Sequence, residues 1–299
     1  MRTLRTVAEL RAELARHAPQ RVGLVPTMGA FHEGHLSLMR RARAECDLVV
    51  VSLFVNPTQF NESGDLDAYP RDEALDAGLA DETGVDILFS PSVEEVYPAG
   101  FATTVAVGDE LTETLEAVGR GRRHFDGVAT VVTKLFGMVG PDVAYFGQKD
   151  VQQTLVIKRL ARDLNLPVRI EVCPIVREPD GLAMSSRNGH LSSSERQRAT
   201  ALHRVLLATE SAVHDGELDP DALCAEALTE LRRSGLEPEY YALVNPRNLT
   251  RVERIDGPVL AVVAARVGTT RLIDNHPVST VDSPARPVAA GTEQTTKGS

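Results

Sequence analysis

Two histidines three residues apart, His32 and His35, carry the first sign of chemistry in this sequence. They lie in Met28-Gly-Ala-Phe-His-Glu-Gly-His35, which follows an apolar segment at 22–25 and precedes a segment with helical periodicity. A helix start exposes backbone N–H groups and the positive end of the helix dipole, which favour an anion such as a phosphate. The stretch therefore predicts a phosphate site. A histidine cap beside a surface histidine, or a zinc pair completed from elsewhere in the chain, are alternatives that the spacing leaves open.

Polar residues also follow two other apolar segments. Asn56 and Gln59 come at the end of the apolar run that starts at residue 47, and Lys149 and Asp150 follow the one at 142–146. Ligands of open α/β sheets bind beyond the carboxyl ends of the strands, so we expect these side chains beside the histidines. An Asn-Pro turn and an exposed Lys-Asp pair explain the same residues when each is taken alone.

A loop at 176–188 brings hydroxyl groups and a permanent cation together. Ser185, Ser186 and Arg187 follow the apolar segment at 168–175. Such a loop can close over a polyphosphate and stabilise the charge that develops on it. It can also be a linker and hinge between domains. The basic cluster at 120–125 is either a solvated face or, in an acidic chain, an anion contact.

The segments that position these residues alternate between strand and helix. Nearly unbroken apolar runs are typical of parallel strands covered on both faces, and they occur at 22–25, 47–56, 85–91, 142–146 and 168–175. Helical periodicity predicts helices within 1–20, at 127–139, after the two histidines and after Asp150. A further helix is expected before the segment at 85–91, and the polar loop at 61–76 is long enough to be a lid or a wall. Residues 92–127 are expected to be irregular, apart from a short strand at 104–107.

The pattern changes beyond residue 190. A capping box, Ser192 with Glu195, opens a helix expected to run to about 213, and further elements are expected as a helix at 220–234 and strands at 240–245, 259–267 and 270–274. The predicted fold is α/β, with a Rossmann-like parallel-sheet domain at 1–176, a smaller α+β domain at 177–282 and a disordered tail at 283–299.

Bulk composition narrows the function classes. The chain has 299 residues, 42% hydrophobic and 25% charged, as is ordinary for a globular protein, and its formal charge of -10 argues against nucleic acid as the main partner. No apolar run is long enough for a membrane span, so we expect a cytoplasmic protein. Three distant cysteines, Cys46, Cys173 and Cys224, are expected to be buried thiols.

His32-Glu-Gly-His35 together with Met184-Ser-Ser-Arg187 resembles the two-part signature of the nucleotidylyltransferase superfamily. Within it, the chain is similar to the pantoate-beta-alanine ligase family over residues 1 to about 280. The strings that carry this resemblance are Pro26-Thr-Met-Gly-Ala-Phe-His-Glu-Gly-His35, Phe54-Val-Asn-Pro-Thr-Gln-Phe60, Phe146-Gly-Gln-Lys-Asp150 and Val176-Arg-Glu-Pro-Asp-Gly-Leu-Ala-Met-Ser-Ser-Arg-Asn188.

The resemblance implies an ATP-dependent condensation of (R)-pantoate with beta-alanine, which yields pantothenate, AMP and pyrophosphate through a pantoyl adenylate. It also implies that Mg²⁺ accompanies ATP and that the protein is a cytoplasmic homodimer whose smaller domain acts as a lid. The partners would be these small molecules, with neither nucleic acid nor membrane involved.

The resemblance also implies roles for particular residues. His35, the proton donor, would act in catalysis with His32, Lys149 and Arg187. The ATP site would comprise Met28, Gly29, Ala30, Phe31, His32, Glu33, Gly34, His35, Gly147, Gln148, Lys149, Asp150, Val176, Met184, Ser185, Ser186 and Arg187. Gln59 and Gln153 would bind pantoate, with Asn56 also in the pantoate and beta-alanine site, and Asp76 would bind the metal.

Two departures from the family pattern leave questions open. The family has Arg-Pro-x-His-Phe where this chain has Gly121-Arg-Arg-His-Phe125, so Arg120, Arg122 or Arg123 could replace the displaced arginine. The family often has a pair of acidic residues that helps to hold magnesium, where this chain has Leu75 and Asp76. Asp72 or Glu73 could replace the missing acidic residue.

Two other functions fit the superfamily signature. One is an enzyme that leaves the nucleotidyl group on its product, and the other is a catalytically silent nucleotide-binding protein. Gln59 and Gln153 favour the ligase over the first, and the retention of His32, His35, Lys149 and Arg187 argues against the second. An aminoacyl-tRNA synthetase is disfavoured by the short, acidic chain.

Overall fold

A six-stranded parallel sheet forms the larger part of the molecule. The computed structural model describes residues 1–60, 66, 69–108 and 110–279. The strand order is β1-β4-β3-β2-β5-β6, with bounds β1 (Arg2–Leu4), β2 (Val22–Thr27), β3 (Leu48–Leu53), β4 (Ile87–Phe89), β5 (Val143–Gly147) and β6 (Arg169–Cys173). From β2 the chain builds outward through β3 to β4, and it then returns to place β5 on the other side of β2. The carboxyl ends of β2 and β5 therefore flank a switch point, where α/β sheets bind ligands.

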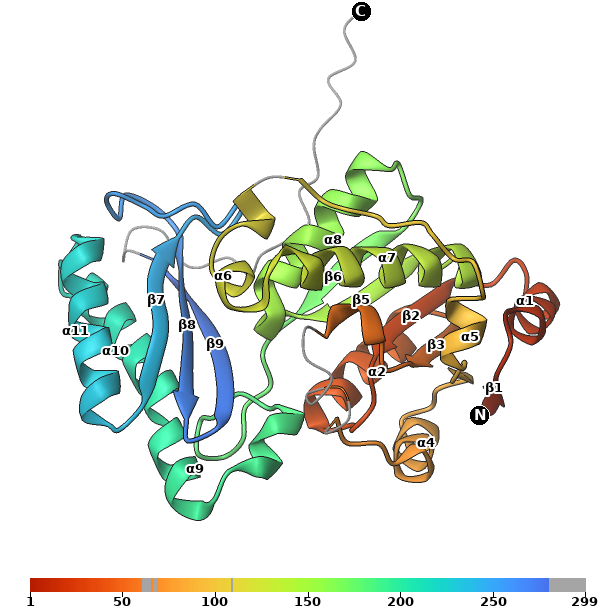
Figure 1. Cartoon of the computed structure of the whole chain (residues 1–299), viewed down its shortest axis with the longest axis horizontal. Coiled ribbons are helices and arrows are strands. Elements are labelled where there is room, and N and C mark those ends of the chain that lie inside the picture. The colour runs from red at the N-terminus through yellow and green to blue at the C-terminus, as the bar shows by residue number, and fades with distance from the viewer. Residues whose placement is uncertain (61–65, 67–68, 109, 280–299) are drawn as a thin grey trace, which may run out of the picture.

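Helices cover both faces of this sheet (Figure 1). Leu24 and Ile87 point into a core shared with α1 (Val7–Arg16), α7 (Arg122–Val139) and α8 (Val151–Asp163). Their chain neighbours Val25 and Leu88 point to the opposite face, under α2 (Glu33–Glu45) and α4 (Glu73–Glu82). Successive strand residues alternate between faces, so a strand buried on both sides must be apolar throughout. The Rossmann-like domain predicted from these runs is confirmed. Strand β1 was not predicted, because three residues are too few to show a pattern.

The region at 92–127 is more regular than expected. It contains α5 (Val93–Val96), η2 (Glu110–Thr112) and α6 (Glu116–Arg120), and α7 begins five residues before the predicted helix. The basic cluster is therefore the end of α6 and the first turn of α7. The strand expected at 104–107 does not form, because the Val105 N–H donates to the Thr130 hydroxyl of α7 at 2.9 Å instead of to a neighbouring strand.

The smaller domain is an antiparallel sheet backed by helices, as the predicted α+β class requires. Its strands, in the order β7-β8-β9, are β7 (Glu237–Val244), β8 (Val259–Val267) and β9 (Thr270–Val278). The helices are α9 (Ser193–Ala199), α10 (Ala201–His214) and α11 (Pro220–Arg233). The capping box of Ser192 and Glu195 is confirmed, but the helix it opens ends at Ala199, and α10 starts after Thr200. Helices α10 and α11 pack on one face of the sheet.

The other face of the small sheet contacts the larger domain. Val244 and Val262 belong to the same core cluster as Phe125 and Leu155 of the large domain, and Tyr240 packs against it. Figure 1 shows the small sheet standing beside α6 and β6. The predicted boundary at residue 176 lies between β6 and η4 (Ser186–His190). The predicted tail at 283–299 lies outside the described residues.

Two simpler expectations can be checked in the described part of the chain. Cys46, Cys173 and Cys224 are buried and free, as predicted. None of the helices that the structure describes is both long and apolar enough to span a membrane.

Candidate active site

His32 and His35 meet at the start of α2, beyond the carboxyl end of β2. His32 is the N-cap residue, and its Nδ1 accepts the Gly34 N–H at 3.1 Å, while His35 Nδ1 accepts the His32 N–H at 3.4 Å. The two imidazole rings lie 4.1 Å apart. Both Nδ1 atoms are acceptors, so in each neutral ring the proton is on Nε2. A Cβ at Gly34 would come within 2.8 Å of the His32 ring, which explains the glycine.

Both histidines are neutral near pH 7. Burial, with help from Lys149, lowers the pKa of His32 to about 4, and burial together with His32 and Lys149 lowers that of His35 to about 3. Neutral rings protonated on Nε2 can donate hydrogen bonds, and they add no positive charge that would repel Lys149. The helix start therefore combines two neutral hydrogen-bond donors, His32 and His35, with one nearby cation, Lys149.

The turn before α2 is anchored by Asp76 of α4. Gly29 and Ala30 both have positive φ, +92° and +52°, and the Asp76 carboxylate accepts the N–H groups of Ala30 at 2.9 Å and Phe31 at 2.7 Å. These two hydrogen bonds hold a left-handed turn that a non-glycine residue rarely adopts. Asp76 is 2% exposed, and burial raises its pKa. The Asp76 carboxylate thus fixes the backbone conformation of the turn at 29–31, which precedes the predicted phosphate site.

Asp76, the predicted metal ligand, is already engaged by backbone groups. Both of its oxygens already accept backbone N–H groups, and no group of three or more His, Cys, Asp or Glu side chains suited to a metal occurs in the described part of the chain. The two compensating candidates are also engaged. Asp72 caps α4 through the Leu75 N–H at 3.0 Å, and Glu73 forms an ion pair with Arg5. We therefore assign Asp76 the role of a backbone anchor, and its part in metal binding stays a prediction.

Asn56 holds Gln59 in place at the end of β3. Asn56 is 1% exposed, and its Nδ2 donates to Gln59 Oε1 and to the Gly127 carbonyl, both at 3.1 Å, while its Oδ1 accepts the Tyr97 hydroxyl at 2.8 Å. The Gln59 side chain lies in η1 (Pro57–Gln59), and its Nε2 approaches Met28 Sδ at 3.1 Å. A Cβ at Gly127 would lie 2.6 Å from the Thr58 carbonyl oxygen, so α7 packs directly on η1.

The segment after β5 is fastened to the smaller domain. Lys149 and Asp150 lie in η3 (Gln148–Asp150), and Asn275 of β9 donates to the carbonyls of Gln148 at 3.0 Å and Lys149 at 3.1 Å. Gln148 in turn donates to Asn275 Oδ1 at 3.2 Å. Lys149 is thereby positioned by residues from both domains.

The loop at 176–187 is closed by its own hydrogen bonds and by β9. The Met184 N–H donates to the Val176 carbonyl at 3.0 Å, and Arg177 binds the buried Asp274 carboxylate with Nη atoms at 2.6 and 3.0 Å. Ser185 caps η4 by accepting the Arg187 N–H at 3.3 Å. Ser186, Arg187 and the segment that contains Lys149 therefore have a common scaffold in β9.

These segments surround one cavity of about 260 Å³ at the switch point. The predicted residues that line it are Met28, His32, Gly34, His35, Asn56, Gln59, Gly147, Lys149, Asp150, Gln153, Val176, Met184, Ser185, Ser186 and Arg187. Six others do not line it. Gly29, Ala30 and Asp76 shape the turn behind it, Phe31 is core, Glu33 pairs with Arg40 on the surface, and Gln148 binds Asn275.

Several lining residues were not predicted from the sequence. Tyr69, from a segment predicted only as a lid or wall, lines the cavity near Ser186, and Tyr240, Asp274 and Asn275 come from the smaller domain. A sequence gives no direct signal for them, because they meet the cavity only after the two domains pack. Gln152 lines it too, but it is 3% exposed and is bonded to backbone groups of α6 and its approach.

The structure distinguishes the three arginines that the sequence left open. Arg120 lines the cavity and donates from Nε to Glu116 at 2.8 Å. Arg122 pairs with Glu113 at 3.6 Å and has a side chain 51% exposed, and Arg123 is also exposed. Arg120 is therefore the arginine that this cluster presents to the site.

Comparison with known sequences gives one family. The family described as Pantoate-beta-alanine ligase matches residues 2–277. A pantothenate synthetase from Cereibacter sphaeroides is 54% identical over 278 residues, which cover 92% of this chain and 99% of that protein. The pantothenate synthetase from Roseiflexus castenholzii is 53% identical and covers 92% of this chain and 98% of its own length.

Solved structures give the same picture. A crystal structure of pantothenate synthetase from Thermus thermophilus matches with a TM-score of 0.85 and 47% identity, covering 92% of this chain and 99% of that one. A pantoate-beta-alanine ligase from Francisella tularensis, complexed with beta-gamma ATP and beta-alanine, matches with a TM-score of 0.78 and 33% identity, covering 92% and 97%.

Proposed function

The chain belongs to the pantoate-beta-alanine ligase family, and we propose that it joins (R)-pantoate to beta-alanine through a pantoyl adenylate formed from ATP. The observation that carries the chemical proposal is the convergence of three segments on one cavity at the switch point. These are the histidine turn after β2, the segment of Lys149 after β5 and the loop that ends in Arg187.

In the first step, a pantoate carboxylate oxygen attacks the α-phosphorus of ATP. A P–O bond forms, the bond to the bridging oxygen breaks, and pyrophosphate leaves with the electron pair. In the second step, the amine nitrogen of beta-alanine attacks the acyl carbon. The amide bond forms, the bond to AMP breaks, and the nitrogen gives up a proton.

The phosphate groups need donors and positive charge. We assign this role to His32 and His35, through Nε2–H groups at the start of α2, and to the Lys149 ammonium. Preorganised donors of this kind stabilise charge that grows on the phosphate oxygens during attack. Ser185, Ser186 and Arg187 would complete the same cluster from the other side of the cavity.

The pantoate end needs neutral polar groups. Gln59 and Gln153 line the cavity and carry amides suited to hydroxyl and carboxylate groups. Asn56 has its amide engaged by protein groups, so we assign it the task of orienting Gln59. Magnesium would enter with ATP as part of the substrate, where it neutralises phosphate charge.

Two further expectations remain proposals. We infer that the protein is a cytoplasmic homodimer. We also infer that the smaller domain acts as a lid, because its strand β9 contacts both the Lys149 segment and the 176–187 loop. Sedimentation of the purified protein would test the dimer.

The decisive experiment measures AMP release with ATP, Mg²⁺ and (R)-pantoate, with and without beta-alanine. We expect AMP to appear in step with pantothenate and only when beta-alanine is present. With pantoate alone, labelled pyrophosphate should exchange into ATP, as a reversible adenylation requires. Amide formation without this exchange would contradict the adenylate.

A further inference from the structure

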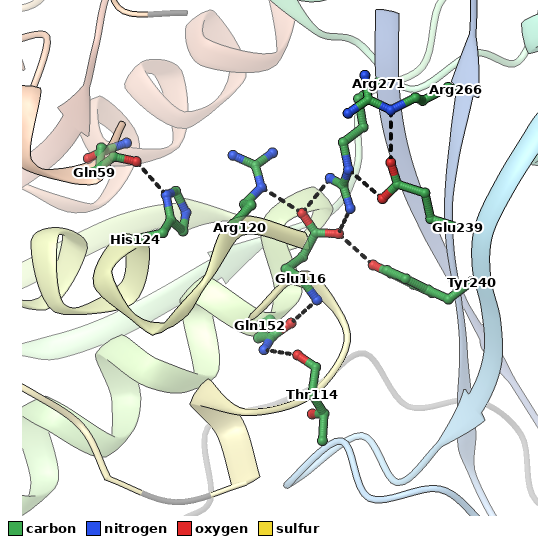
Figure 2. Close-up of polar contacts among 10 residues, drawn as sticks. All are labelled: Gln59, Thr114, Glu116, Arg120, His124, Gln152, Glu239, Tyr240, Arg266 and Arg271. Atoms are coloured by element: carbon green, nitrogen blue, oxygen red, sulfur yellow. Dashed lines mark hydrogen bonds and ion pairs between the residues drawn. The ribbon is translucent and has the colours of Figure 1, made fainter. Parts of the chain in front are cut away.

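Arg120 is held in the cavity by an ion-pair cluster built from both domains. Its Nε donates to Glu116 at 2.8 Å, and the same carboxylate accepts both Nη groups of Arg271 at 2.7 Å and the Tyr240 hydroxyl at 2.7 Å. Glu116 starts α6 in the larger domain, whereas Tyr240 and Arg271 lie in β7 and β9. Figure 2 shows the Arg120 guanidinium between Glu116 and His124. The carboxylate that holds Arg120 is therefore itself fixed by residues of both domains.

The cluster keeps a net positive charge. Glu239 accepts the Arg271 Nε–H at 2.8 Å and pairs with Arg266 at 3.2 Å, so three guanidinium groups face two carboxylates. Glu116 stays ionised, because Arg271 and Arg120 hold its pKa at about 2 despite burial. Arg120 is the cationic member of the cluster that lines the cavity.

Arg120 lies on the Gln59 side of the cavity. His124, one turn further along the chain, makes a 2.7 Å contact from Nδ1 to the Gln59 carbonyl oxygen, and the charge of Arg120 helps to lower the pKa of His124 to about 4 after burial. Lys149, by contrast, acts on His32 and His35 at the start of α2. The permanent cations that line the cavity among the described residues are Lys149, Arg187 and Arg120.

The proposed reaction has two carboxylates with different needs. The pantoate carboxylate must reach the α-phosphorus and loses its charge when the adenylate forms. The beta-alanine carboxylate takes no part in bond making and stays ionised from binding to product release. A fixed cation away from the triphosphate can hold such an anion throughout the reaction, and a guanidinium suits a carboxylate through its paired N–H groups.

We propose that Arg120 binds the carboxylate of beta-alanine, with Glu116 and Arg271 as positioning residues that hold it from the two domains. This assignment rests on the proposed function. It makes Arg120 a specificity determinant: the amine co-substrate is selected for a terminal carboxylate as well as for its amino group.

The test compares the two half-reactions in Arg120→Gln. Exchange of pyrophosphate into ATP with pantoate alone reports adenylation, and amide formation is measured with beta-alanine and with 3-aminopropanamide, which has the same amine but no negative charge. Losing a charge-assisted pair should raise KM for beta-alanine about 100-fold, while exchange stays within about 3-fold of wild type. Wild type should prefer beta-alanine to 3-aminopropanamide, and in Arg120→Gln this ratio of kcat/KM values should fall by a similar factor.

Matched variants complete the design. Arg122→Gln, in the basic stretch at 120–125 but exposed and outside the ion-pair cluster, should behave as wild type. Arg120→Lys keeps the charge without the planar group and should raise KM for beta-alanine about 10-fold, with circular dichroism to confirm folding. Glu116→Gln should raise the same KM more than it lowers kcat, whereas a merely destabilised protein would lose exchange and amide formation together.

Three results would overturn the assignment. The first is an unchanged KM for beta-alanine in Arg120→Lys and Arg120→Gln. The second is a loss of exchange that parallels the loss of amide formation in folded Arg120→Lys. The third is a rise in KM for pantoate or ATP in place of beta-alanine. Failure of the proposed function itself would be recognised separately, because wild type would then make no amide.

Discussion

The Asn275 side chain of the smaller domain is hydrogen-bonded at 3.1 Å to the backbone carbonyl of Lys149, the cation that follows β5 in the larger domain. Asn275 is 2% exposed, so this bond is shielded from water. The position of Lys149, to which we assign phosphate binding, thus depends on how the two domains pack.

Replacing Asn275 with alanine should therefore weaken ATP binding. The carbonyls of Gln148 and Lys149 would lose their donor in a buried site, and we expect KM for ATP to rise about 10-fold with a loss of about 1–3 kcal/mol in the free energy of unfolding. Steady-state kinetics and urea unfolding measure the two effects. Asn248→Ala, in an exposed turn, is the matched control. An unchanged KM for ATP would argue against the coupling.

His35→Ala should leave the fold intact and remove most adenylation activity. The ring supplies an Nε2–H donor at the start of α2, and loss of one positioned donor in an active site lowers rates by about 10²–10³-fold. Pyrophosphate exchange gives the rate, and thermal unfolding checks the fold. Exchange at the wild-type rate would contradict the catalytic role of His35.

Gln152 and Gln153 are neighbours with separate expected roles. Gln153→Ala should raise KM for pantoate, with KM for ATP unchanged, because its amide lines the cavity. Gln152→Ala removes one acceptor and two donors bonded at 2.7–3.0 Å to the α6 approach, so it should lower the free energy of unfolding by about 2–4 kcal/mol. A rise confined to KM for ATP in Gln153→Ala would refute its assignment to pantoate.

Asp76→Asn separates backbone anchoring from metal binding. The amide keeps one acceptor but turns an NH₂ group toward the N–H of Ala30 or Phe31, so the turn should loosen and KM for ATP should rise about 10-fold. The Mg²⁺ concentration for half-maximal activity, measured at saturating ATP, should not change. A large increase in that concentration would show that Asp76 also binds the metal.

Stability should fall in mildly acidic solution because His124 is buried as the neutral ring. Its pKa is lowered to about 4 in the folded protein, mainly by burial and then by Arg120, against about 6.5 when unfolded. Between these values the unfolded state binds the proton first, so stability falls as pH drops from 6.5 toward 4. From pH 7 to 5 we expect this group to remove about 2 kcal/mol. Urea unfolding at both pH values should show a smaller loss in His124→Gln, and parallel losses would exclude His124 as the cause.

The larger sheet could be predicted from the sequence because helices cover both of its faces. A strand covered on both faces must be largely apolar, so β2, β3 and β5 stand out as nearly unbroken apolar runs. The polar residues that follow them could then be brought together by topology alone, because parallel strands end at one edge. Strand β1 and helix α6 were missed, since three and five residues carry too little periodicity.

By itself, then, the sequence determined the parallel sheet, the histidine turn, the Lys149 segment and the donors at 184–187, because each is written in a continuous stretch of chain. Only the tertiary structure decided which polar residues face the cavity and which support the protein. It made Asp76 an anchor, separated Gln152 from Gln153 and selected Arg120 from three arginines. The physical reason is that these outcomes depend on partners distant in sequence, such as Ala30 for Asp76 and Arg271 for Glu116, which meet only when the layers and domains pack.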